Sequence, residues 1–150
     1  MLKGIDPLIP PDLLGILASM GHGDEIAIVD ANFPAESYAR EPVHITGADS
    51  ARVLRAVLSL MPVDDFVEEP ACVMRPVSVD DAKPATHAEY QRVLNADAGT
   101  DIHVGQLDRF DFYDRVTDCF AVIATGERRL YGNIIVKKGV IRPGGPEAAP

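Results

Sequence analysis

The chain has 150 residues, of which 47% are hydrophobic and 25% are charged, and its formal net charge at pH 7 is −9. This length and balance are typical of a single globular domain with its own core, not of disordered, fibrous or membrane-spanning chains. The lysines and arginines are scattered, which argues against a nucleic-acid partner, because binding a phosphate backbone requires clustered positive charge.

Apolar periodicity in the N-terminal half predicts helices and strands in alternation. Two prolines precede the first helix and Gly21 follows it, and both are typical helix boundary signals. A later helix has Asp49 or Ser50 as its capping residue and is stopped by Pro62. The elements expected in this half are a helix over residues 12–20, strands over 25–29 and 44–46, and a helix from 49 or 50 to 61.

The C-terminal half continues the alternation. Thr86 and Glu89 have the spacing of a capping box, which predicts a helix that runs to about Asn95. A helix over 108–117 is expected to turn Phe112 and Val116 inward, with Phe110 as a further candidate. The strands expected in this half are 71–77, 102–107, 120–124 and 134–136, and the last two are close enough in the chain to pair as a hairpin.

This order of elements favours one fold class, a three-layer α/β/α domain with a largely parallel, mixed sheet. A single domain is expected over residues 1–141. Residues 142–150 are rich in proline, glycine and alanine, so we expect them to form a disordered tail.

The sequence carries no export or membrane signal. In the first 14 residues, Asp6 and three prolines interrupt any apolar core of a signal peptide, so a cytoplasmic location is expected. No apolar run approaches the length of a membrane helix, so no membrane partner is expected. Cys72 and Cys119 lie in apolar runs without CxxC spacing or a nearby histidine, a pattern that predicts buried, reduced thiols.

One candidate acid–base residue lies in the stretch MGHGDEIAIVDANFP, where His22 stands between two glycines. Histidine exchanges protons near neutral pH, and small neighbours leave its imidazole open to a ligand. The alternative is that a histidine just past a helix C-terminus only complements the helix dipole. The residues alone leave both interpretations open.

Asp30 closes the apolar strand of the same stretch. In open α/β sheets ligands bind at the carboxyl ends of strands, where a carboxylate could hold ligand hydroxyls or orient an imidazole. The alternative is an aspartate that only initiates a turn. Asp24 and Glu25 lie beside His22, but no HExxH-like spacing or thiolate accompanies them, so no metal site is expected.

Two further polar groups stand at boundaries between elements. Arg109 follows a strand and begins a helix, and Tyr131, Gly132 and Asn133 lead into the last strand. Arginine, tyrosine and asparagine supply several hydrogen-bond donors, and glycine allows close backbone approach, although each alone is commonly ordinary surface chemistry. Dinucleotide fingerprints, phosphate loops and serine nucleophile elbows are missing from the sequence, so no cofactor is expected.

Three separated segments resemble, in order and spacing, the RbsD/FucU family of sugar mutarotases, and within it the L-fucose mutarotase branch. They are MGHGDEIAIVDANFP, RFDFYDR and TGERRLYGNIIVKKGV, and the resemblance runs from Met1 to about Val140. The chain departs from the branch at Asn32, where a histidine is usual. That position bears on substrate preference and on no residue with an assigned proton-transfer role.

The resemblance implies a function for each candidate residue. In the family, the histidine at the position of His22 is the proton donor, and the residues that line the sugar site here are Asp30, Arg109, Tyr131, Gly132 and Asn133. It also implies a three-layer α/β/α fold and a ring-shaped homo-oligomer, typically a decamer, with sites near subunit boundaries.

This implied activity needs no metal, nucleotide or redox centre, because interconverting α and β anomers requires only proton transfers that open and close the sugar ring. The expected partner is a monosaccharide, L-fucose or a relative. Two alternatives remain open: a pyranase-type ring isomerase acting on ribose, and a non-catalytic sugar-binding protein that accompanies a transporter or regulator.

Overall fold

The computed structural model describes residues 2–77 and 84–143, and within them six strands form one sheet in the order β2-β5-β1-β6-β3-β4. The strands are β1 (Glu25–Val29), β2 (Val43–Ile45), β3 (Ala71–Met74), β4 (Val104–Leu107), β5 (Ala121–Thr125) and β6 (Ile134–Lys137). The helices are α1 (Pro11–Ser19), α2 (Ala35–Tyr38), α3 (Ser50–Leu58), α4 (Ala85–Ala98) and α5 (Arg109–Asp118). Most of the expected disordered tail, residues 144–150, lies outside the described residues.

The sheet is largely parallel, as predicted, because only β6 runs against its neighbours β1 and β3, while the other three pairings are parallel. The predicted hairpin of the last two strands is wrong, since β1 lies between β5 and β6. Residues 126–133 cross the end of β1, where the Ala31 amide donates to the Glu127 carbonyl at 2.8 Å. β1 therefore occupies the centre of the sheet and is buried on both faces.

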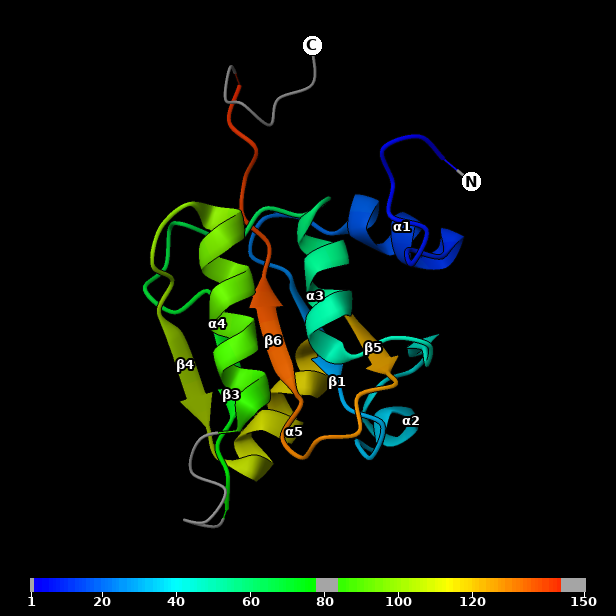
Figure 1. Ribbon diagram of the computed structural model, residues 1–150, viewed down its shortest axis with the longest axis vertical. Helices are drawn as coiled ribbons and strands as arrows, with labels where there is room; N and C mark the ends of the chain where they lie inside the picture. Colours follow the sequence, from blue (N-terminus) through cyan, green and yellow to red (C-terminus); the bar gives the residue numbers. More distant parts are fainter. Residues whose placement is uncertain (1, 78–83, 144–150) are drawn as a thin grey trace.

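Helices cover both faces of the sheet, which confirms the three-layer architecture (Figure 1). Along β1 the side chains alternate: Ile26 and Ile28 pack in a core with α1, α3 and α4, whereas Ala27 and Val29 pack in a second core with α2 and α5. In Figure 1, α3 and α4 lie in front of the sheet and α5 lies behind it. No helix among the described residues is long and apolar enough to cross a membrane.

Two details of the expected helices are wrong. Thr86 does not cap α4, because Pro84 is the N-cap residue and makes no side-chain cap bond, while Thr86 is buried inside the first turn. Phe110 points outward and is 72% exposed. It is two residues from the buried Phe112, which on a helix of about 3.6 residues per turn is nearly the opposite side.

Other boundaries agree with the expected elements or differ from them by a few residues in either direction. Asp49 caps α3 by accepting a hydrogen bond from the Arg52 amide at 2.8 Å. The third strand ends at Met74, before Pro76, rather than at Val77. The short helix α2 was not anticipated, since no helix was expected between the first two strands.

The topology gives the sheet two distinct edges. The carboxyl edge is where β1, β2, β3, β4 and β5 end and β6 begins; the amino edge is the opposite one, where β6 ends. In Figure 1 the amino edge faces the top and the carboxyl edge the bottom. Asp30 follows β1 at the carboxyl edge, whereas His22 precedes β1 at the amino edge.

Candidate functional site

Asp30 and Asn133 form a reciprocal pair at the carboxyl edge. The Asp30 amide donates to Asn133 Oδ1, and Asn133 Nδ2 donates to Asp30 Oδ2, both at 2.9 Å. The Asn32 amide donates to Asp30 Oδ1 at 2.9 Å, as expected for an aspartate that starts a turn. Asp30 is only 5% exposed, and this burial raises its pKa although the hydrogen bonds oppose the change. The turn role and the ligand role proposed for Asp30 are therefore compatible.

Gly132 lies between the Asp30–Asn133 pair and the Glu127 side chain. A Cβ atom at Gly132 would lie 2.5 Å from Glu127 Cγ and 3.3 Å from Asp30 Cβ. Any larger residue would push against the buried Glu127 side chain. Glycine is required here because the Glu127 side chain lies so close to it.

Tyr131 is held by its backbone and by its hydroxyl. Its φ of 59° lies in the left-handed region that non-glycine residues seldom adopt. Its carbonyl lies 3.1 Å from His87 Nε2 and accepts a longer, 3.5 Å hydrogen bond from Thr86 Oγ1. Its hydroxyl accepts from the Val77 amide at 3.2 Å. The first turn of α4 therefore fixes an unusual conformation beside Gly132.

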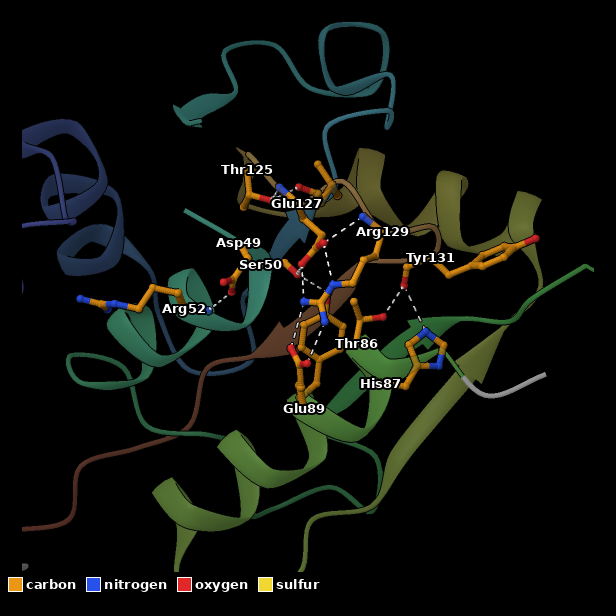
Figure 2. A network of polar contacts seen from close by, with 12 residues as sticks. Asp49, Ser50, Arg52, Thr86, His87, Glu89, Thr125, Glu127, Arg129 and Tyr131 are labelled. Carbon is orange, nitrogen blue, oxygen red and sulfur yellow. Dashed lines mark hydrogen bonds and ion pairs between the residues drawn. The ribbon is translucent and has the colours of Figure 1, made fainter. Parts of the chain in front are cut away.

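A polar network built around the buried Glu127 lies beneath this loop, and its Ser50, Glu127 and Arg129 side chains were not among the predicted site residues (Figure 2). The Glu127 carboxylate accepts hydrogen bonds from the amide, Nε and NH2 atoms of Arg129 and from Ser50 Oγ. Arg129 also reaches Glu89, with nitrogen–oxygen distances of 2.7 and 3.0 Å. The bonds from Arg129 lower the pKa of Glu127 to about 2, although Glu127 is only 3% exposed.

The same network extends into the core through Ser50, whose hydroxyl lies 2.6 Å from that of Tyr90. Burial raises the pKa of Tyr90, so this hydroxyl stays protonated. The sequence signal that could have pointed to this network was the presence of Glu127 and Arg129 in the segment TGERR, shortly before Tyr131-Gly132-Asn133. From sequence alone that pair is indistinguishable from a solvated turn, because burial follows only from the packing of α3 and α4.

Arg109 stands at the start of α5 on the same edge. Its Nε donates to the Tyr113 hydroxyl at 3.3 Å, and its guanidinium carbon lies 5.5 Å from the centre of the Tyr113 ring. The Tyr113 hydrogen bond raises the pKa of Arg109, and Tyr131 adds a smaller contribution in the same direction. Tyr113 also contacts the rings of Phe33 and Tyr38, with centroids 5.2 and 5.0 Å away. An exposed cation therefore lies against an aromatic cluster.

His22 lies at the amino edge with a partner that the sequence analysis missed. Its Nε2 atom is 3.1 Å from Asp64 Oδ1, and its ring lies 5.1 Å from that of Phe66. The His22 side chain is 45% exposed, whereas that of Asp64 is 2% exposed. A buried carboxylate that accepts from one ring nitrogen orients the imidazole and leaves its other nitrogen available. Asp64 follows Pro62 by two residues in an irregular segment, so no periodicity singled it out.

The structure thus brings together five of the six predicted site residues. Asp30, Arg109, Tyr131, Gly132 and Asn133 lie at the carboxyl edge, and His22 does not. The five residues of β1 separate the two edges by about 16 Å at the usual rise of a strand. Within one chain, His22 and Asp30 therefore do not face the same ligand.

Neither edge resembles a metal centre. Among residues 2–77 and 84–143, no group of three histidine, cysteine, aspartate or glutamate side chains could hold an ion. Cys72 is buried, as predicted, and Cys119 is partly buried. Burial raises the pKa of Cys72 to about 11 and that of Cys119 to about 12, so both thiols stay protonated and unreactive.

The chain is similar to known proteins along nearly its whole length. The model of the RbsD / FucU transport protein family matches residues 3–141. Fucose mutarotase of Mus musculus is 47% identical over 147 residues, covering 93% of this chain and 95% of that protein. L-fucose mutarotase of Histophilus somni (strain 2336) is 42% identical over 140 residues, covering 93% of this chain and 97% of that protein.

A solved structure agrees with this similarity. The crystal structure of the fucose mutarotase from Streptococcus pneumoniae in complex with L-fucose matches with a TM-score of 0.88 and 42% identity, covering 94% of this chain and all of the other. Fold, family model and relatives therefore coincide over the same residues, and the chain belongs to the RbsD/FucU family.

Proposed function

We propose that this protein is a cofactor-free mutarotase, an isomerase that interconverts the α and β anomers of L-fucose or a closely related monosaccharide. The observation that carries the proposal is the hydrogen-bonded group of Asp30, Gly132 and Asn133, with Tyr131 beside it, at the carboxyl edge. The relatives that are 42% and 47% identical bear the name of this activity. The structural neighbour from Streptococcus pneumoniae, also 42% identical, holds L-fucose.

The carboxyl edge supplies the recognition of the sugar. The Asp30 carboxylate accepts hydrogen bonds from the Asn32 amide and from Asn133 Nδ2, and these fix its orientation as an acceptor for a sugar hydroxyl. Arg109 adds donors from an exposed guanidinium, and the aromatic face of Tyr113 beside it suits the apolar side of a sugar. Because Asp30 and Asn133 hold one another in place, little conformational entropy is lost when the sugar binds.

The reaction itself consists of two proton transfers. The anomeric hydroxyl gives its proton to a base, which solvent water can supply, as the ring oxygen gains a proton from an acid. The bond between C1 and the ring oxygen then breaks, and C1 becomes an aldehyde. Rotation about C1–C2 and the reverse steps close the ring as the other anomer. His22 donates the proton to the ring oxygen, and a positioned acid–base group of this kind contributes about 10² to 10⁴-fold.

His22 can take this role if it comes from a neighbouring copy of the chain. Large apolar side chains are exposed near both edges: Phe66 and Ile141 are 62% and 48% exposed near His22, and Val77 and Phe110 are 73% and 72% exposed at the carboxyl edge. Contact between the amino edge of one copy and the carboxyl edge of the next would cover both sets. A heterologous contact of this kind generates a ring when the rotation between successive copies closes. The resemblance to the family suggests a decamer.

The expected cytoplasmic location is part of the same proposal. Two free cysteines without a disulfide between them suit a reducing compartment, and L-fucose metabolism would supply the sugar there.

Saturation-transfer NMR on an equilibrium mixture of L-fucose anomers tests the activity. The wild-type protein is expected to accelerate exchange between the α and β resonances, and His22→Ala to slow it by about 10² to 10⁴-fold. Saturable binding of L-fucose without faster exchange would instead identify a sugar-binding accessory protein. Faster exchange with ribose than with L-fucose would identify a pyranase-type isomerase.

Mixing two inactive variants tests the shared site. His22→Ala and Arg109→Ala remove residues from opposite edges, so an equal mixture that is unfolded and reassembled would restore about one quarter of the sites, namely those that draw both intact edges from different chains. The double variant His22→Ala/Arg109→Ala is the control, because none of its sites can be restored. Failure of the mixture to recover activity would show that each chain works alone.

A further inference from the structure

The segment Lys137-Lys138-Gly139 at the end of β6 has no role in the proposed chemistry, yet it hydrogen-bonds to residues on both sides of His22 and to Asp64 itself. The Lys138 ammonium donates to the carbonyls of Leu17 and Met20, at 2.8 and 2.6 Å. These carbonyls belong to the C-terminal end of α1, which has no basic residue in its own last turn. Lys138 therefore supplies both the missing donor and the missing positive charge at this helix end.

The main chain of Lys138 holds the other side of the same turn. Its carbonyl accepts from the Gly23 amide at 2.9 Å, and its amide donates to the Asp24 carbonyl at 2.8 Å. The side chain thus fixes the residue before Gly21-His22, and the main chain fixes the residues after it. Gly23 has a φ of +88°, so the turn adopts a conformation that most residues avoid and that external contacts must maintain.

The neighbours of Lys138 hold Asp64 in the same way. The Asp64 amide donates to the Lys137 carbonyl at 3.1 Å, and the Gly139 amide donates to the Pro62 carbonyl at 2.8 Å. A Cβ atom on Gly139 would lie only 2.5 Å from the Val63 carbonyl oxygen and 2.8 Å from Asp64 Cα. One short segment therefore sets the backbone positions of both the imidazole turn and its carboxylate partner.

We propose that Lys138 is a positioning residue that holds the His22 turn against Asp64 and so keeps the imidazole aligned for proton transfer. This inference rests on the proposed function. Among the described residues no carboxylate pairs with the Lys138 ammonium, so its charge is directed entirely at the end of α1. A lysine kept only for solubility would point into solvent, whereas this side chain is partly buried and makes two short bonds.

Lys138→Met tests the proposal because methionine keeps the aliphatic length and removes the donor. Anomer exchange is expected to lose about 10 to 100-fold in kcat, since misplacing a reacting group by about 1 Å can cost this much. KM should stay close to the wild-type value, because the sugar-binding residues lie at the other edge of each chain. Lys138→Arg retains donors and should restore part of kcat. Lys3→Met removes the same charge from an exposed N-terminal position and should change neither constant.

Hydrogen exchange measured by mass spectrometry provides a readout that does not depend on activity. In Lys138→Met, exchange should accelerate in peptides covering residues 18–24 and stay unchanged in β1. An unchanged kcat, or a kcat loss that only matches the fraction of unfolded protein, would overturn the positioning role. If the wild-type protein catalyses no anomer exchange, the proposed function fails, while faster local exchange in the variant would still support Lys138 as the residue that holds this turn.

Discussion

At the carboxyl edge, Asp30 and Asn133 are 5% and 3% exposed and already hydrogen-bonded to each other, whereas at the amino edge the His22 side chain is 45% exposed. The two edges also differ in what holds them. Hydrogen bonds between side chains hold the carboxyl edge. The backbone at the end of β6, together with the Lys138 side chain, holds the amino edge. Only the amino edge presents its reactive group to solvent.

This difference indicates that the carboxyl edge recognises the sugar and that the amino edge supplies the acid–base group. Hydrogen-bonding groups that are fixed before the ligand arrives give selective recognition of a polyol, because little reordering accompanies binding. An exposed imidazole on a buried carboxylate can approach a ligand on another copy, because one of its ring nitrogens remains available.

The largest effect is expected from Glu127→Ala. This change removes a buried carboxylate that accepts four hydrogen bonds and packs against Gly132. Because Arg129 is 42% exposed and keeps Glu89 as a partner, the cost comes mainly from the lost hydrogen bonds of the buried carboxylate, about 2–3 kcal/mol of unfolding free energy. L-fucose affinity should fall with it, because Gly132 and Tyr131 lose their support. Urea unfolding at fixed protein concentration and calorimetric titration with L-fucose measure the two effects.

Glu89→Ala is the matched control for Glu127→Ala. Glu89 bonds to the same guanidinium, but its side chain is 29% exposed, against 3% for Glu127. Removing an exposed partner of an ion pair costs roughly 0–1 kcal/mol. Equal losses in the two variants would mean that burial of Glu127 does not stabilise the carboxyl edge.

Acid should lower the unfolding free energy by protonating Glu127 at the carboxyl edge. The hydrogen bonds from Arg129 lower the pKa of Glu127 from 4.5 to about 2, so its stabilisation is complete above pH 4.5 and is lost as the pH falls toward 2. The full loss is on the order of 3 kcal/mol. Asp30 acts in the opposite direction just above pH 3.8, because burial raises its pKa. Unfolding free energies measured from pH 6 down to 3 should fall less steeply in Glu127→Gln than in the wild type.

Asp64→Asn should affect the amino edge alone. The amide keeps an acceptor for the Phe66 backbone, which bonds to Asp64 Oδ1 at 3.1 Å, but removes the carboxylate that orients the His22 imidazole. We expect kcat to fall by about tenfold, equivalent to 1.4 kcal/mol, with the L-fucose dissociation constant unchanged. Anomer-exchange kinetics and calorimetry separate the two quantities. A loss of affinity without a loss of kcat would place Asp64 in sugar binding instead.

Local patterns predicted most of the fold, whereas the family resemblance singled out the residues that lie at the carboxyl edge. β1 was predicted with its exact bounds, and Asp30, Arg109 and Tyr131-Gly132-Asn133 lie where strands end or begin, which is why topology gathers them. The order β5-β1-β6 was missed, because pairing between strands depends on contacts far apart in the chain.

The separation of His22 from Asp30 was also missed, although both stand in one 15-residue stretch. Adjacency in sequence suggested adjacency in space, but a strand between two residues carries them to opposite edges of a sheet. Asp64, Glu127 and Lys138 share a second limitation. Their roles come from burial and from carbonyl or amide partners that no residue pattern encodes.

The smallest effect on stability is expected from Asn32→His, at the position where the chain departs from the L-fucose mutarotase branch. Asn32 holds Asp30 through its backbone amide, at 2.9 Å from Asp30 Oδ1, and its own side chain is exposed. The substitution preserves that bond, so unfolding free energy should change by less than about 0.5 kcal/mol. Any change in the rates of anomer exchange of L-fucose and ribose, measured side by side, is then due to the added imidazole. A shift in the ratio of the two rates would make this position a determinant of sugar preference, and an unchanged ratio would leave preference to Arg109 and its aromatic neighbours.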